Sequence, residues 1–228
     1  MSGAYQPVAL IIGMGPGLSA ALAKRFAAGG FTVAGFARNP DKSAALAESM
    51  AANGQHLVLR GVDASDFSAL AGAAASVEAE LGPIEVLIYN AYRATIGLPS
   101  QVSVDEVVVD FRVNVASALA AVQAVLPAMR ERGRGTILLT GGGLALDPTG
   151  WLPASSLAIG KAGIRNLAQT LNKEISETGI RVSTVTITGQ IAPETPFAPD
   201  VIAEIYWGLH SEAGLVPVEV IFAPKADA

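Results

Sequence analysis

The sequence contains no cysteine, and only two of its 228 residues are histidines. Without a thiol, disulfide bridges, thiolate metal sites and cysteine-based catalysis are all excluded. The two histidines, His56 and His210, lie far apart in the sequence, so we expect no metal site. Charge is also sparse, because charged residues make up 15% of the chain and give a net charge of −5. That weakly acidic balance, with no basic stripe, argues against a nucleic-acid partner.

A second absence is a continuous apolar run of the length that a membrane span needs. The most apolar stretch, from Val113 to Met129, is interrupted by Asn114, Ser117 and Gln123. It falls short of the roughly 18 apolar residues that suggest a membrane span. No basic segment precedes an apolar run near the N-terminus, so we expect no secretory signal. These patterns predict a cytoplasmic protein without a membrane partner.

The chain alternates short apolar runs rich in Val, Ile and Leu with helical patterns rich in Ala and Leu. The predicted strands span residues 7–13, 32–38, 56–62, 84–90, 135–141, 181–188 and 216–222. The predicted helices span residues 17–29, 42–53, 66–81, 103–132, 155–178 and 199–210. This alternation is typical of a parallel sheet covered on both faces. We therefore expect an α/β protein with a doubly wound Rossmann fold: one domain over residues 1–228, with a seven-stranded, mostly parallel sheet and helices on both faces.

The segment from Gly189 to Asp200 contains three prolines and is predicted to be a loop. It follows the C-terminal end of the sixth predicted strand, where ligands bind in sheets of this kind. We therefore expect residues 189–212 to form a lid over a small-molecule substrate.

A glycine-rich turn joins the first predicted strand to the first predicted helix, with the sequence GMGPGLS from Gly13 to Ser19. Glycines allow positive φ and let backbone N–H groups approach a pyrophosphate closely. The N-terminus of the following helix adds partial positive charge. The same turn could be a tight connection without a ligand, but its place at the first strand-to-helix junction favours a dinucleotide site.

The end of the second predicted strand bears on which dinucleotide binds. An NAD site usually has an acidic residue there, about 20 residues after the glycine turn. Here the strand ends in Arg38, with Lys42 close behind. A guanidinium group matches a phosphate, so Arg38 favours the 2′-phosphate of NADP over NAD. The alternative is that Arg38 is a solvated arginine of the turn.

Further motifs resemble those of the short-chain dehydrogenase/reductase family, in order and over nearly the whole chain. Gly13 and Gly17 match two glycines of that family's Gly-x-x-x-Gly-x-Gly turn, while Ser19 replaces the third. Asp63 follows the third predicted strand, where the family has an aspartate near the adenine. The resemblance implies a nicotinamide dinucleotide as cofactor.

The later strands and helices carry the other matches. The fourth predicted strand ends in Asn90-Ala91, which resembles the family's Asn-Asn-Ala-Gly. Asn114 resembles the family's structural and catalytic asparagine, and Lys161 resembles the lysine that holds the nicotinamide ribose. Gly189 lies in a turn that resembles the family's Pro-Gly. The cofactor-binding residues that the resemblance implies are Gly13, Gly15, Pro16, Gly17, Leu18, Arg38, Asp63, Ala64, Asn90, Ala91, Lys161 and Gly189.

Two catalytic positions of the family hold residues without the usual chemistry. The family's proton donor is a tyrosine one helical turn before the lysine, but Leu157 stands four residues before Lys161. A variant position of the tyrosine, seven residues before the lysine, is Ala154. The family serine after the fifth strand corresponds to Gly142. The nearest hydroxyl belongs to Thr140, which we expect on the same strand face, one step deeper, as a weak substitute.

Another group must then donate the proton if the protein is a reductase. The candidates are Tyr92, which follows Asn90-Ala91, together with Tyr206 and His210. We rank Tyr92 first because it lies at the C-terminal end of a strand beside the expected cofactor. Each aromatic has an alternative interpretation: Tyr92 could pack over the cofactor, and the other two could pack within the lid. The predicted catalytic residues are therefore Asn114, Lys161 and Tyr92.

Two functions remain open. The first is an atypical NADP(H)-dependent oxidoreductase acting on an unknown small molecule, with the proton supplied by Tyr92, water or Lys161. Burial could lower the pKa of a lysine toward working pH, and an alkene or imine substrate would tolerate a weak acid. The second is a catalytically silent NADP(H)-binding sensor or partner subunit. The presence of both Asn114 and Lys161 favours the enzyme.

The predicted helices 103–132 and 155–178 contain many small residues, among them Ala116, Ala118, Ala120 and Ala121. Small residues permit close approach of helices between subunits. The family that the chain resembles commonly pairs these two helices across a two-fold axis. We therefore predict a homodimer or homotetramer, the alternative being that these residues only pack on the sheet.

Overall fold

Seven strands form one sheet in the computed structural model, which describes residues 6–175 and 177–223. They are β1 (Val8–Ile12), β2 (Thr32–Ala37), β3 (Leu57–Gly61), β4 (Ile84–Tyr89), β5 (Gly135–Thr140), β6 (Ile180–Ile187) and β7 (Glu219–Phe222). Their order is β3-β2-β1-β4-β5-β6-β7, and each neighbouring pair is parallel. The predicted Rossmann fold is confirmed, and the strand order changes direction between β1 and β4.

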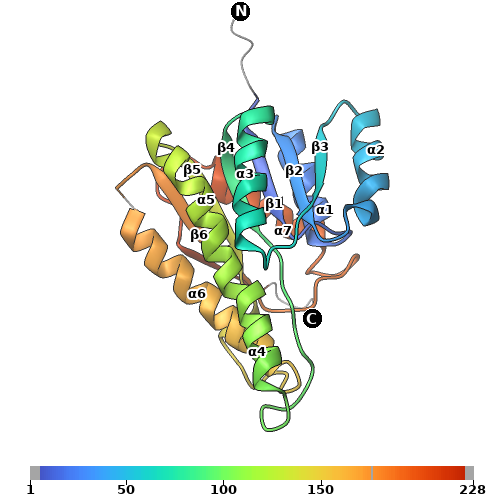
Figure 1. The fold of residues 1–228 in the computed structure, drawn as a ribbon, viewed down its shortest axis with the longest axis vertical. Coiled ribbons are helices and arrows are strands. Elements are labelled where there is room, and N and C mark those ends of the chain that lie inside the picture. Colours follow the sequence, from blue (N-terminus) through green and yellow to red (C-terminus); the bar gives the residue numbers. More distant parts are fainter. Residues whose placement is uncertain (1–5, 176, 224–228) are drawn as a thin grey trace, which may run out of the picture.

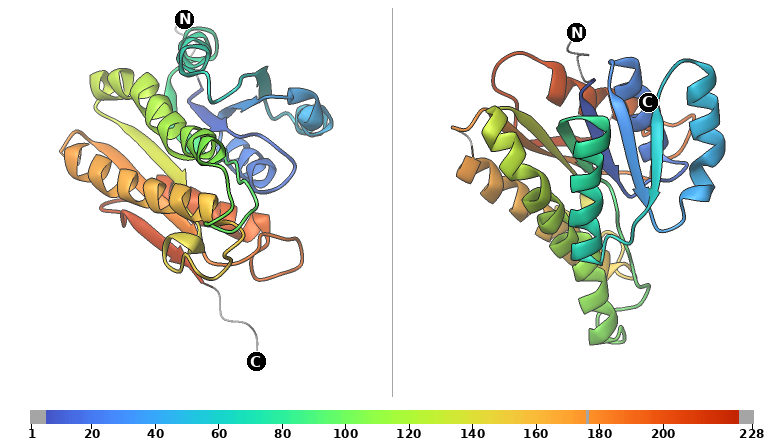
Figure 2. Two further views of the ribbon diagram at one scale, coloured as in Figure 1. Left: turned by 60° about the horizontal axis from the view of Figure 1, so that its bottom comes forward. Right: turned by 45° about the horizontal axis from the view of Figure 1, so that its top comes forward.

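Helices cover both faces of this sheet (Figures 1 and 2). They are α1 (Leu18–Ala28), α2 (Ala44–Ala52), α3 (Phe67–Leu81), α4 (Val104–Phe111), α5 (Ser117–Arg132), α6 (Ser155–Ile175) and α7 (Pro199–Ser211). One core lies between the sheet and α3, α5 and α6. A second core lies between the opposite face of the sheet and α1, α2 and α7.

The residues of β1 explain why the strands read as continuous apolar runs. All five are buried, since both faces of a central parallel strand are covered. Successive side chains alternate between the faces. Leu10 and Ile12 belong to the core under α3, α5 and α6, whereas Ala9 and Ile11 belong to the core under α1 and α7.

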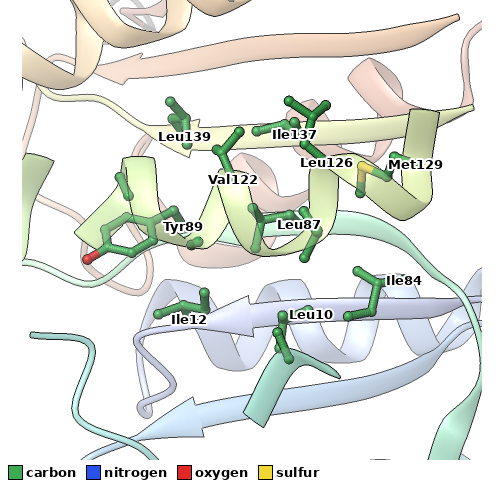
Figure 3. Close-up of a cluster of buried hydrophobic side chains, with 14 of the residues drawn as sticks. Leu10, Ile12, Ile84, Leu87, Tyr89, Val122, Leu126, Met129, Ile137 and Leu139 are labelled. Carbon is green, nitrogen blue, oxygen red and sulfur yellow. The ribbon is translucent and has the colours of Figure 1, made fainter. Parts of the chain in front are cut away.

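One helical path runs from Val104 to Arg132, as α4, a π-helical segment (Arg112–Ala116) and α5. By length and composition it could cross a membrane, although only 33% of its most apolar window is buried. Its α5 part packs on the sheet, because Val122 and Leu126 lie over the strands (Figure 3). The helix predicted over 103–132 is thus present, but the π-helical turn within it was not predicted.

Two predicted boundaries differ from the structure by three residues, whereas the others differ by one or two at most. The last strand was expected over 216–222 but begins at Glu219, since Pro217 has no N–H to donate to a strand ladder. The helix predicted over 155–178 ends at Ile175. There the amide of Thr178 turns back to the Ile175 carbonyl at 3.0 Å, and Gly179 follows with a φ of 76°.

Candidate active site

The C-terminal ends of the parallel strands meet at one edge of the sheet, in the lower part of Figure 1. In open α/β sheets ligands bind outside this edge, where the strand order changes direction. That point lies between β1 and β4, so the glycine turn after β1 and Asn90-Ala91 after β4 flank it. The residues that follow β5 and the lysine of α6 lie on the α6 side of the same edge.

Gly13 fixes the glycine turn against the end of β4. Its φ is 92°, and a Cβ on it would lie 2.4 Å from the backbone nitrogen of Ala91. The neighbouring amide of Asn90 donates to the carbonyl of Ile12 at 2.8 Å. Only glycine fits such an approach, so the predicted cradle residues Gly13, Asn90 and Ala91 are brought together.

The rest of the turn is open on its outer side. A Cβ on Gly15 or Gly17 would meet no heavy atom within 4 Å. The hydroxyl of Ser19, which stands in place of a glycine, accepts a hydrogen bond from the Gly15 amide at 2.9 Å and so braces the turn. Helix α1 starts at Leu18 with no side-chain cap and no acidic residue in its first turn. Its first N–H groups therefore remain for an anion, and the pyrophosphate of a dinucleotide fits this space.

Arg38 stands at the end of β2 with its side chain exposed, and Lys42 is exposed on the following turn. The carboxylate of Asp63, after β3, accepts hydrogen bonds from the amide and hydroxyl of Ser65 at 2.9 and 2.8 Å. These bonds, with a smaller contribution from the charge of Arg38, lower the pKa of Asp63. Ala64 packs against the adjoining core. Two cations and an ionised carboxylate thus lie where a dinucleotide's adenosine end is expected.

The side chain of Asn114 holds the loop that follows β4. Asn114 lies in the π-helical segment and is buried. Its amide oxygen accepts from the backbone N–H of Arg93 at 2.8 Å, and its amide nitrogen donates to the Arg93 carbonyl at 2.8 Å. Gly160 of α6 lies so close that a Cβ there would be 2.6 Å from this nitrogen. The whole side chain is therefore engaged in positioning the backbone around the site.

Tyr89, the last residue of β4, contacts the π-helical segment from the side of the sheet. Its hydroxyl donates to the carbonyl of Val113 at 2.5 Å, and burial raises its pKa. A π-helical turn interrupts the regular ladder of helix hydrogen bonds, and such turns often occur at functional sites. Sequence reasoning missed this role, because a tyrosine at the end of a buried strand is also a common core residue.

An ion cluster holds the same loop from the side of α4. The guanidinium of Arg93 pairs with the carboxylates of Glu106 and Asp110. Asp110 is fully buried and accepts from the Thr95 amide at 2.6 Å. Burial alone would raise the pKa of Asp110, but hydrogen bonds from Ser156, Thr95 and Arg93 outweigh it and lower the pKa. The sequence offered one signal for this cluster, the spacing of two acids one turn apart on a predicted helix.

Lys161 reaches from α6 to the end of β5. Its Nζ donates to the carbonyl oxygen of Thr140 at 2.8 Å. A Cβ on Gly142 would lie 3.2 Å from Cε of Lys161 and 3.3 Å from its Cδ and Cγ. Desolvation by the surrounding protein lowers the pKa of Lys161 to about 8. The structure therefore joins Lys161 and Gly142, which lie far apart in the sequence.

Tyr92 borders this lysine on the open side. The Nζ of Lys161 lies 5.9 Å from the centre of the Tyr92 ring. The ring is 65% exposed, so it stands at the mouth of the site rather than in the core. The structure thus brings Tyr92 near Lys161. The hydrogen bonds that it records orient neither the hydroxyl nor the ring of Tyr92.

The other candidate donors lie elsewhere. The hydroxyl of Thr140 accepts from Tyr206 at 2.8 Å, and Tyr206, a residue of α7, is fully buried on the opposite face of the sheet. The expectation that Thr140 substitutes for a serine is not supported, because β5 ends at Thr140 and the strand period does not extend to Gly142. His210 contacts Thr136, at the opposite end of β5, with 3.0 Å between Nδ1 and Oγ1.

Large apolar side chains are exposed on the loops after β4 and β5. They are Tyr92, Ile96, Leu98, Leu146, Trp151 and Leu152. The two loops are tied together, since the Gly97 amide donates to the Pro153 carbonyl at 2.8 Å. Exposed apolar groups gathered in this way mark a surface for a ligand or partner.

The loop after β6 folds back on its own beginning. A Cβ on Gly189 would lie 2.3 Å from the ring of Phe197, so this ring covers the predicted cofactor-binding glycine. The helix that follows, α7, is anchored by Ile202 and Tyr206, which are fully buried. The predicted lid segment therefore consists of a surface loop and a core helix.

Comparison with known proteins assigns the family. The short chain dehydrogenase family model matches residues 7–198. The chain belongs to this family. The oxidoreductase asL5 of Sarocladium schorii is 30% identical over 189 residues, covering 82% of this chain and 74% of that protein. The 2,3-dihydro-2,3-dihydroxybenzoate dehydrogenase of Bacillus subtilis (strain 168) is 30% identical over 178 residues, covering 78% and 67%.

Solved structures agree over almost the whole chain. A metagenomic short-chain oxidoreductase in complex with NADP superimposes with a TM-score of 0.87 and 26% identity, covering 96% of this chain and 98% of that one. A short-chain dehydrogenase from Rhodopseudomonas palustris gives a TM-score of 0.86 and 25% identity, covering 96% and 99%. By fold and by sequence, the chain is therefore an oxidoreductase of the short-chain dehydrogenase/reductase type.

Proposed function

We propose that the protein is an NADP(H)-dependent oxidoreductase that reduces or oxidises a small apolar substrate. The observation that carries the proposal is the open space over Gly15 and Gly17, at the uncapped N-terminus of α1. A dinucleotide pyrophosphate needs such space beside free N–H groups. The similar metagenomic oxidoreductase was solved with NADP, which adds support.

Arg38 and Lys42 favour NADP(H) over NAD(H). Both are exposed at the end of β2, where the adenosine ribose lies in Rossmann folds. The guanidinium can hold a 2′-phosphate through paired hydrogen bonds, and the ammonium adds a second positive charge. An NAD site would instead place an acid at the end of this strand.

The other cofactor-binding residues are proposed in the roles that their positions support. Gly13, Asn90 and Ala91 form the floor of the cradle, and Pro16 and Leu18 border the pyrophosphate. Asp63 and Ala64 lie beside the adenine, and Gly189 lies beside the nicotinamide. Lys161 holds the nicotinamide ribose. The bound cofactor supplies or accepts the hydride, as nicotinamides do.

Three residues are proposed for the catalytic site, with different tasks. Lys161 faces the reacting groups with its ammonium. Tyr92 forms a wall of the substrate site, beside that ammonium. Asn114 is a positioning residue, since both polar atoms of its side chain bind the backbone of Arg93.

The exposed apolar side chains around the mouth support a substrate with an apolar body. Trp151 and Leu152 from one loop and Ile96 from the other would cover it from two sides. A lid, if it closes over this substrate, is limited to residues 189–198, because α7 is anchored in the core. Closure would exclude water from the reacting groups.

Self-association is proposed for the face formed by α4, α5 and α6. Apolar side chains on this face are exposed, namely Val104, Val108, Val109, Phe111, Leu119 and Ile159. A homodimer or homotetramer would cover them, as expected from the small residues of these helices. Light scattering at micromolar concentration should give at least twice the chain mass of 23.2 kDa, and a monomer would contradict the proposal.

A catalytically silent NADP(H)-binding protein is the second candidate, and Leu157 favours it. This apolar residue lies one helical turn before Lys161, where the family resemblance implies a tyrosine. The two functions are separated by incubating the protein with NADPH and a panel of aldehydes, ketones, enones and imines. Consumption of NADPH that Lys161→Ala abolishes supports the enzyme. Tight NADPH binding without consumption across the panel supports the silent protein.

A further inference from the structure

We infer that Lys161 is itself the proton donor of the reduction, and that Gly142 makes room for its side chain to act so. This inference rests on the proposed oxidoreductase function and assigns the acid for it. Two features of the structure lead to it. The first is the position of the Lys161 ammonium at the edge of the sheet. The second is that the hydroxyls of Tyr89 and Tyr206 already donate hydrogen bonds elsewhere.

The ammonium of Lys161 lies at the edge of the sheet where a ligand is expected. Nζ lies at the C-terminal end of β5, bonded to the Thr140 carbonyl and next to the exposed ring of Tyr92. This is the edge at which the glycine turn and the Asn90-Ala91 segment lie. A substrate between the cofactor and the apolar mouth would therefore face this ammonium.

Most phenols that the structure describes are already engaged. The hydroxyl of Tyr89 donates to the Val113 carbonyl, and that of Tyr206 donates to Thr140 on the other side of the sheet. Tyr92 is the remaining tyrosine within residues 6–175 and 177–223, and it is 65% exposed. Its hydroxyl is free to rotate into water, whereas the ammonium of Lys161 is held in place by a hydrogen bond of 2.8 Å.

Gly142 makes this placement of Lys161 possible. The methylene chain of the lysine passes within 3.2 to 3.3 Å of the point where a Cβ would stand. A serine at this position would push the chain aside by a few tenths of an ångström and would add a hydroxyl against it. The absence of a side chain at position 142 therefore allows Lys161 to reach the end of β5.

The charges around Lys161 leave it able to release a proton. The loss of hydration lowers its pKa to about 8, and no carboxylate contributes to the shift. On its own helix Arg165 is paired with Glu219 at 2.9 Å, and Glu219 also accepts from Thr186 of β6. On the side of α4, Glu106 and Asp110 are paired with Arg93. The amine is therefore protonated at neutral pH and is a stronger acid than an exposed lysine.

The proposed reduction transfers one hydride and one proton to a carbonyl group. Hydride from NADPH forms a C–H bond at the carbonyl carbon, and the C=O π electrons move onto oxygen. That oxygen takes a proton from Nζ, which becomes a neutral amine, while NADPH leaves as NADP⁺. The products are an alcohol and NADP⁺, and the amine regains its proton from water before the next turnover.

The first test compares Lys161→Arg with wild type. Arginine keeps the positive charge and the N–H donors for the ribose, but it does not release its proton. Wild-type kcat/KM for reduction should fall above pH 8, and Lys161→Arg should be slower by about 100-fold or more without that fall. NADPH affinity should change by only a few fold. Lys173→Arg, an exposed lysine on the same helix, is the matched control.

The second test needs no turnover. The Nζ of Lys161 is titrated by ¹⁵N NMR in the cofactor-free protein, in wild type and in Gly142→Ser. The midpoint should lie near 8 in wild type and should rise in Gly142→Ser, because the displaced ammonium regains water. A wild-type midpoint at the ordinary value of 10.5 would overturn the inference.

The outcomes separate the inference from the proposed function. If NADPH does not bind, the proposed function fails, and the assignment of Lys161 fails with it. If NADPH binds and substrate is reduced, but Lys161→Arg keeps the wild-type rate and pH profile, only the assignment fails. A fall above pH 8 that is lost in Tyr92→Phe and kept in Lys161→Arg would make Tyr92 the donor.

Discussion

The side chain of Lys161 passes over Gly142, and the missing Cβ of that glycine leaves its path open to the Thr140 carbonyl. Gly142 and Leu157 stand where the family resemblance implies a serine and a tyrosine. In the proposed reductase, the absence of both side chains leaves the lysine against the end of β5 with its ammonium toward the substrate, so that the acid is an amine.

Leu157→Tyr should increase carbonyl reduction. The substitution places a phenol one helical turn before Lys161 on the half-buried face of α6, where the ammonium can lower the pKa of the phenol. A positioned general acid contributes on the order of 100-fold or more. The measurement is kcat/KM with NADPH and an aldehyde or ketone that wild type reduces slowly. Leu157→Phe, which adds the ring without the hydroxyl, is the control and should give no increase.

Gly13→Ala and Gly15→Ala should differ sharply. At Gly13 the new Cβ would meet the Ala91 backbone at 2.4 Å in a conformation with a φ of 92°, so unfolding should become easier by about 3 kcal/mol or more. At Gly15 the Cβ enters open space, so stability should stay within about 1 kcal/mol. That methyl group would, however, occupy the pyrophosphate space, so NADPH affinity should fall. Urea denaturation and NADPH titration of both variants test the pair. Equal stability of the two would contradict the geometry described for Gly13.

Arg38→Glu should reverse the cofactor preference. A charged hydrogen bond contributes about 1.5 to 3 kcal/mol, so NADPH affinity should fall by about 10- to 100-fold. NADH affinity should not fall, because a glutamate can accept from the free 2′-hydroxyl. Lys24→Glu, an exposed lysine of α1, makes the same charge change away from the expected ribose and should leave the NADPH/NADH ratio unaltered. A similar fall for both variants would indicate general electrostatics rather than a phosphate contact.

Asp110→Asn should lower the stability of the folded protein and reduce the further loss of stability that wild type shows at acidic pH. The pKa of Asp110 is lowered in the folded state, so its contribution to stability is present above the ordinary value of 3.8 and is lost as pH falls through the folded value. Because Arg93 is 34% exposed, the loss at pH 7 should be about 2 kcal/mol, below that of a fully buried pair.

Denaturation of Asp110→Asn at pH 7, 5 and 3 checks this expectation against wild type. The difference between the two proteins should be similar at pH 7 and 5 and smaller at pH 3, where wild type begins to lose the pair. Asp105→Asn, an exposed acid on the same helix, should change stability by less than about 0.5 kcal/mol. A constant difference at all three pH values would show that Asp110 does not titrate with folding.

Much of the fold could be predicted because its signals are local. Strands such as β1 are buried on both faces and read as unbroken apolar runs, and Gly13 marks the turn that ends one of them. Boundaries were less certain, since the start of β7 depends on Pro217 and on pairing with β6. The π-helical segment could not be predicted, because it depends on the contact between Tyr89 and Val113.

The candidate site was likewise predictable only in part. The residues Gly13, Asn90 and Ala91 were identified from order along the chain, and the structure brings them together. The expected substitution of Thr140 for a serine failed because strand periodicity stops where the strand stops. The passage of Lys161 over Gly142 could not be foreseen, since nothing in a sequence states which side chain will fill the space beside a glycine.

Isothermal titration of the purified protein with NADPH, and separately with NADH, measures the proposed dinucleotide binding itself. NADPH should bind saturably with one site per chain and more tightly than NADH, and its affinity should fall clearly in Gly15→Ala. Saturable binding of NADH with no binding of NADPH would contradict the role of Arg38. The absence of binding heat for both dinucleotides at several temperatures would contradict the dinucleotide site itself.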